Sequence, residues 1–80
     1  MLNRICIITR KDSKGLKNVR IKGAFKNAFG VEPDEIRVEM RNIIVHTSME
    51  LKENKVRKFA ENLGSYSQFM GSGDSYSFKL

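Results

Sequence analysis

Residue types that carry out catalysis or crosslink small proteins are scarce in this sequence, which has one cysteine, one histidine and no tryptophan. A single cysteine excludes an internal disulfide, and Cys6 lies in an apolar run, where we expect a small buried hydrophobic residue. Neither Cys6 nor His46 has a second residue at metal-ligand spacing or a partner that would form a catalytic pair. We therefore predict no catalytic residue, no metal and no cofactor, and we interpret the chain as a binding protein, not an enzyme.

Long apolar runs are also missing. The apolar run near the N-terminus, Ile5–Ile8, is too short for a signal peptide, and no stretch approaches the length of a membrane span. The lone cysteine favours a reducing compartment. We therefore predict a cytoplasmic protein that does not enter a membrane. The 80 residues, with 40% hydrophobic and 30% charged side chains, predict one globular domain over 1–80.

Acidic side chains are nearly missing from the first thirty residues, which have eight basic residues and only Asp12 as an acid. The other fifty residues have seven basic and eight acidic groups, so the net charge of +6 arises from the first part of the chain. Charge gathered in one stretch creates a directed field that attracts a polyanion or an acidic protein surface. Seven of these residues, called here the basic stretch, are predicted to form the binding surface: Arg10, Lys11, Lys14, Lys17, Arg20, Lys22 and Lys26.

The first half of the chain has clear periodic patterns. Residues 2–9 are rich in consecutive apolar residues, which is typical of a central strand. Apolar residues at helical spacing predict a helix over 17–29, which ends before Gly30. Residues 35–41 alternate and residues 43–47 form a second β-type run. A two-residue turn at Arg41-Asn42 would pair Val38 with Val45 and Met40 with Ile43, which brings their apolar faces together.

The second half predicts a helix over 49–63, with Ser48 as its N-cap, and a strand over 75–80. That strand is either single or forms a hairpin with residues 66–70 around the turn at Gly71–Asp74. The glycine-rich turn could form an anion-binding nest, but it lacks the lysine of a Walker A loop. A hairpin turn is therefore the preferred interpretation.

The order β-α-β-β-α-β predicts an α+β fold, a ferredoxin-like two-layer sandwich. In this arrangement two helices cover one face of a four-stranded antiparallel sheet with the first strand at its centre. The predicted core comprises Ile7, Phe25, Val38, Val45, Phe59 and Phe78. The first strand has no aromatic residue for stacking a base on the open face. Contact with a nucleic-acid backbone is therefore favoured over base recognition.

Two functions are compatible with this pattern. The first is a small module that binds the backbone of RNA or DNA through the basic stretch. The second is a regulator or inhibitor, of viral or cellular origin, that docks the same residues on an acidic surface of a larger protein or nucleoprotein enzyme. The sequence does not choose between RNA, DNA and protein as the partner.

Overall fold

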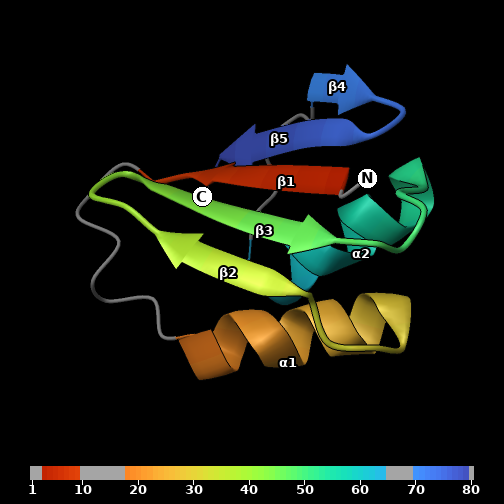
Figure 1. The fold of residues 1–80 in the computed structure, drawn as a ribbon, viewed down its shortest axis with the longest axis horizontal. Helices are drawn as coiled ribbons and strands as arrows, with labels where there is room; N and C mark the ends of the chain where they lie inside the picture. Colours follow the sequence, from red (N-terminus) through yellow and green to blue (C-terminus); the bar gives the residue numbers. More distant parts are fainter. Residues whose placement is uncertain (1–2, 10–17, 65–69, 80) are drawn as a thin grey trace.

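The computed structural model describes residues 3–9, 18–64 and 70–79, which form a small α+β fold with a five-stranded mixed sheet (Figure 1). The elements are β1 (Asn3–Ile8), α1 (Asn18–Phe29), β2 (Glu35–Val38), β3 (Asn42–Thr47), α2 (Glu53–Asn62), β4 (Met70–Ser72) and β5 (Ser75–Lys79). Both helices pack on one face of the sheet, and the other face is open. Within these residues, neither helix has the length and apolar character needed to cross a membrane.

The strand order is β2-β3-β1-β5-β4, with β1 at the centre as predicted. The prediction of four antiparallel strands is wrong, because β5 runs parallel to β1 and β4 is a fifth strand that pairs antiparallel with β5. A terminal hairpin is confirmed, but Gly71 and Ser72, predicted in its turn, belong to strand β4, and residues 66–69 of the predicted strand lie outside the described residues. Burial explains which of its strands takes the inner place. Tyr76 and Phe78 of β5 are buried, whereas all three residues of β4 are exposed, so β4 can occupy the edge.

The hairpin of β2 and β3 has a different register from the predicted one. Val38 pairs with Ile43 and Ile36 pairs with Val45, a shift of two residues that keeps the same side chains on the same face. The cause is a longer turn, closed where the Glu39 amide donates to the Asn42 carbonyl at 2.8 Å. As a consequence Val38, which we expected in the core, is 42% exposed at the edge of the sheet.

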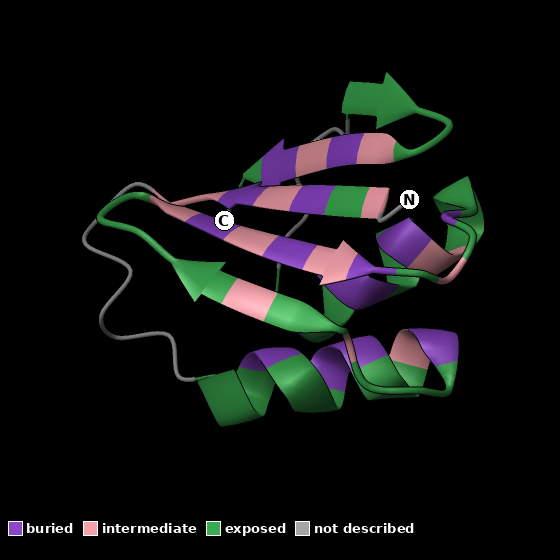
Figure 2. Ribbon diagram, viewed as in Figure 1, coloured by how far each residue is buried: buried purple, intermediate pink, exposed green. Residues whose placement is uncertain are grey.

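The core lies between the helices and the inner face of the sheet. Figure 2 shows buried and less buried residues alternating along β1, β3 and β5. Phe59 of α2 is at the centre, with ring centroids 5.5 Å from Phe25 and 5.8 Å from Phe78, both in edge-to-face geometry. Apart from Val38, the predicted core residues are all confirmed as buried.

Helix α2 begins at Glu53, later than the sequence predicted, and Ser48 is not its N-cap. Lys52 occupies that position without a side-chain hydrogen bond. The amide of Ser48 instead donates to Oδ2 of Asp34 at 2.6 Å, and the amide of Met49 donates to Oγ1 of Thr47 at 3.0 Å. These bonds hold the segment after β3 in a non-helical conformation and delay the start of the helix.

Candidate functional site

Helix α1 exposes the two lysines that the sequence singled out. One side of the helix, with Ile21 and Phe25, is buried, so the opposite side faces solvent. Four exposed residues at three- and four-residue spacing form this side, called here the α1 ridge: Val19, Lys22, Gly23 and Lys26. The helix has no acidic residue at all, so the ridge has positive charge along its length.

Lys22 and Lys26 are one helical turn apart on this ridge. Within the described part of the chain, neither lysine forms a salt bridge or hydrogen bond with a carboxylate. Two like charges at this spacing destabilise a helix by a few tenths of a kcal/mol, about 0.2–0.5. An external anion placed between them would remove that repulsion.

Arg20 has a different environment from the lysines. Its Nη2 donates to the carbonyl of Leu63, at the C-terminal end of α2, at 3.4 Å. A cation at the C-terminus of a helix is favourable because the unpaired carbonyls there are the negative end of the helix dipole. The side-chain Nδ2 of Asn62 donates a further hydrogen bond to the Ala24 carbonyl at 3.3 Å. Arg20 therefore links the two helices, a structural role that the sequence did not reveal.

The other predicted binding residues cannot be placed. Arg10, Lys11, Lys14 and Lys17 lie outside the described residues, in the segment that joins β1 to α1. Of the basic stretch, the structure thus brings Lys22 and Lys26 together on one exposed ridge. It places Arg20 at the contact between the helices.

The open face of the sheet is the second candidate surface. Arg4 of β1 pairs with His46 of β3 and Ser75 of β5, and their side chains share this face. Cys6 is in the next row of the sheet and is only half-buried, so the prediction of a buried cysteine is wrong. The consecutive apolar residues of β1 divide between the two faces, with Ile5 and Ile7 on the inner one.

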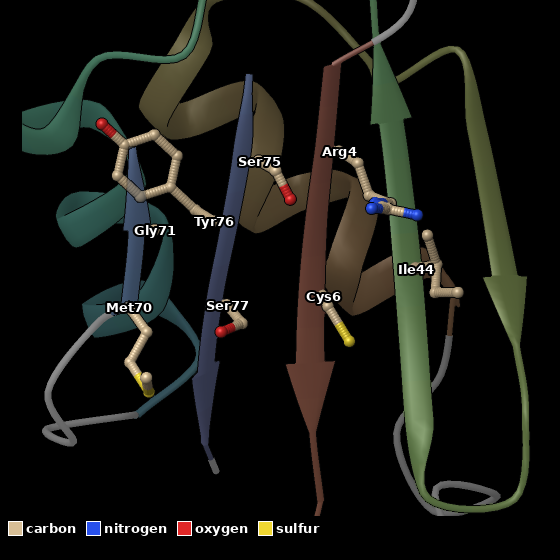
Figure 3. A pocket seen from close by; sticks show the side chains of 8 residues that line it. All are labelled: Arg4, Cys6, Ile44, Met70, Gly71, Ser75, Tyr76 and Ser77. Carbon is tan, nitrogen blue, oxygen red and sulfur yellow. The ribbon is translucent and has the colours of Figure 1, made fainter. Parts of the chain in front are cut away.

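A hollow of about 340 Å³ lies on this open face (Figure 3). Its lining residues are Arg4, Cys6, Ile44, Met70, Gly71, Ser75, Tyr76 and Ser77. The short side chains of Cys6, Ser75 and Ser77 form the floor, because they cover the backbone less than their neighbours do. The longer side chains of Arg4 and Ile44 flank it on one side, and Met70 flanks it on the other.

The sequence analysis missed this hollow, although one signal was present. The small residues Ser75 and Ser77 alternate with the buried Tyr76 and Phe78, which indicates a strand with little side-chain volume on its outer face. The neighbours of β5 in the sheet were not known, so the residues on either side of the serines could not be named.

Neither the possible metal ligands nor the comparisons with known proteins assign a function to this chain. Within residues 3–9, 18–64 and 70–79, no group of three histidine, cysteine, aspartate or glutamate residues could hold a metal ion. No protein-family model, curated protein or solved structure matches this chain. The candidate function has to be argued from the two surfaces themselves.

Proposed function

We propose that this protein is a small nucleic-acid-binding module whose α1 ridge contacts the phosphate backbone. The observation that carries the proposal is the exposure of Lys22 and Lys26, one turn apart, without a carboxylate partner among the described residues. Lysines arranged in this way displace condensed counterions from a nucleic acid, and the release of those ions favours binding.

The rest of the basic stretch supports the same partner. Residues 10–17 directly precede α1 in the chain and have four basic side chains against one acid, Asp12. A polyanion with regularly spaced phosphates can contact several cations at once, whereas a small anion uses one or two. Charge of one sign that continues from this segment into α1 therefore favours an extended anionic partner.

Contact with the backbone is favoured over recognition of bases. Base stacking requires exposed aromatic rings, yet every aromatic residue in the described ranges is buried. These residues are Phe25, Phe29, Phe59, Tyr76 and Phe78. We accordingly propose binding with little sequence preference.

An acidic protein surface is the second candidate partner, and Val19 is the observation that favours it. This residue is 80% exposed on the same ridge as the lysines. An exposed apolar side chain adds no favourable contact with a phosphate backbone, whereas protein interfaces combine apolar and charged contacts. In this alternative the protein is a regulator or inhibitor that docks through α1.

The fold is proposed to be a variant of the ferredoxin-like sandwich. The order β2-β3-β1, with β1 antiparallel to β3, matches one half of that arrangement. The terminal hairpin takes the place of its last strand. The topology itself leaves the function open, since such folds have many functions.

Fluorescence anisotropy with labelled single-stranded RNA, single-stranded DNA and duplex DNA tests the proposed function. At physiological salt we expect a Kd tighter than about 10⁻⁵ M with similar values for unrelated sequences. A Kd no better than about 10⁻⁴ M for every nucleic acid would refute this function. Capture of a defined acidic protein through α1, lost in a Val19→Ser variant, would then support the alternative.

A further inference from the structure

We propose that the hollow on the open sheet face binds a small organic anion, with one ring-sized apolar body and one carboxylate or phosphate group. This site is separate from the α1 ridge, because it lies on the sheet face that the helices leave open. The inference therefore does not depend on the proposed binding of nucleic acid.

The charge of the hollow selects an anion. Among the described residues that line it, Arg4 is the only charged one, and none is acidic. Arg4 is exposed and has no carboxylate partner within the described part of the chain. A guanidinium group binds carboxylate and phosphate through two parallel hydrogen bonds, which a neutral ligand cannot match.

The nearest acid in the turn does not neutralise this arginine. The carbonyl of Asp74 accepts a hydrogen bond from the backbone amide of Arg4 at 2.9 Å, which fixes the position of the strand end. The carboxylate of Asp74 is exposed at the turn and is not part of the lining. The bond thus orients the backbone of Arg4 and leaves its guanidinium group to a ligand.

The polar and apolar lining residues lie at different ends, which gives the ligand a direction. Arg4 and Ser75 are register partners and form the polar end. Cys6 and Met70 each pair with Ser77 in the next row, so the two sulfur-containing side chains lie on either side of Ser77 at the other end (Figure 3). The acid group would contact Arg4 and the hydroxyl of Ser75, with the apolar body over Cys6 and beside Met70.

The size of the hollow sets the size of the ligand. Its volume of about 340 Å³ is near the lower end of small-molecule sites, roughly 300–1,000 Å³. An apolar cavity of about 150 Å³ is enough for a benzene ring. The hollow therefore has room for one ring and its acid group.

The test is a titration of the ¹⁵N-labelled protein with benzoate, phenyl phosphate and neutral benzamide, followed by NMR amide shifts. We expect saturable shifts at Arg4, Cys6, Ser75 and Ser77 with a Kd of about 1–10 mM for the two anions. Arg4→Gln should weaken binding of both anions by at least about fivefold. Arg37→Gln removes an exposed arginine of the same face from outside the hollow, and should leave the Kd within about twofold.

A second variant tests shape separately from charge. Ser77→Leu keeps Arg4 and fills the floor of the hollow, so it should abolish the saturable shifts while the rest of the spectrum stays unchanged. If this variant does not fold, the comparison of Arg4→Gln with Arg37→Gln still decides the question. Equal affinity for benzamide and benzoate, equal effects of the two arginine variants, or no saturation by about 20 mM would overturn the proposal.

Discussion

Gly71 of β4 lies so close to Ser75 of β5 that a Cβ atom at position 71 would collide with the Ser75 carbonyl oxygen. Gly71 also has a φ of 117°, a backbone conformation that residues with a side chain rarely adopt. Both constraints arise because the terminal hairpin turns within two residues and presses β4 against β5. Glycine at this position is therefore a requirement of the hairpin that forms one side of the hollow.

Gly71→Ala should destabilise the fold by about 2–3 kcal/mol, since the collision adds to the backbone strain. Urea denaturation measures this loss. Gly73→Ala is the matched control, because Gly73 has a φ of 64° but open space around it, so only strain of about 1–2 kcal/mol is expected. Equal losses for the two variants would contradict the close packing of β4 on β5.

Gly23→Ala should have the opposite sign. Gly23 is inside α1 and has no positive φ, and a Cβ atom there would meet no described atom within 4 Å beyond its chain neighbours and the backbone of its own helix. Alanine lowers the entropy of the unfolded chain without a steric cost, so the stability should rise by about 0.5–1 kcal/mol. A lower midpoint in the same urea titration would mean that this side of α1 is covered, contrary to the structure.

Phe59→Ala should cost about 3–5 kcal/mol, because the ring touches Phe25 and Phe78 at the centre of the core. Such a loss would unfold most molecules of a domain this small, as circular dichroism would show. Val38→Ala is the comparison that tests the observed register, since Val38 is at the exposed edge. It should cost less than about 1 kcal/mol, and a larger loss of stability would indicate that Val38 is packed in the core.

The alternating pattern predicted which residues of β2 and β3 share a face, but it could not give their register. Any shift of two residues preserves that pattern. The observed register is set by the turn, which is closed by the hydrogen bond from the Glu39 amide to the Asn42 carbonyl. The start of α2 was missed for a similar reason. Ser48 is a good N-cap residue, yet its backbone amide donates to the carboxylate of Asp34, fourteen residues away. Rules for helix capping consider only neighbouring residues, so they could not predict this bond.

The candidate site was predicted only in part, for a related reason. Charge is a property of the sequence, so Lys22 and Lys26 could be found on the helix before the structure was known. The hollow at Arg4 needs four strands side by side, β3, β1, β5 and β4, and β5 comes next to β1 only through long-range pairing. No local pattern in the chain contains that information.

Arg20 and Lys22 should respond differently to the loss of their charge, although they are two residues apart. Arg20→Met removes the hydrogen bond to the Leu63 carbonyl and should lower stability by about 1 kcal/mol. Lys22→Met removes no bond to a described residue and should change stability by less than about 0.5 kcal/mol. Thermal unfolding of the two variants distinguishes them, and equal values would exclude the helix-linking role of Arg20.

The final prediction concerns the charge of the α1 ridge. If Lys22 and Lys26 each contact a phosphate, the variant Lys22→Gln/Lys26→Gln should reduce the slope of log K against log salt by about two. Stability should stay constant or rise slightly, because a like-charge pair is removed.

The control, Lys52→Gln/Lys58→Gln, removes the same charge from exposed residues at the start of α2 and within it. The slope of this control should change by less than about one, since distant exposed charges are screened at physiological salt. Equal slopes for both double variants would mean that net charge alone drives binding, and the ridge would lose its assigned role.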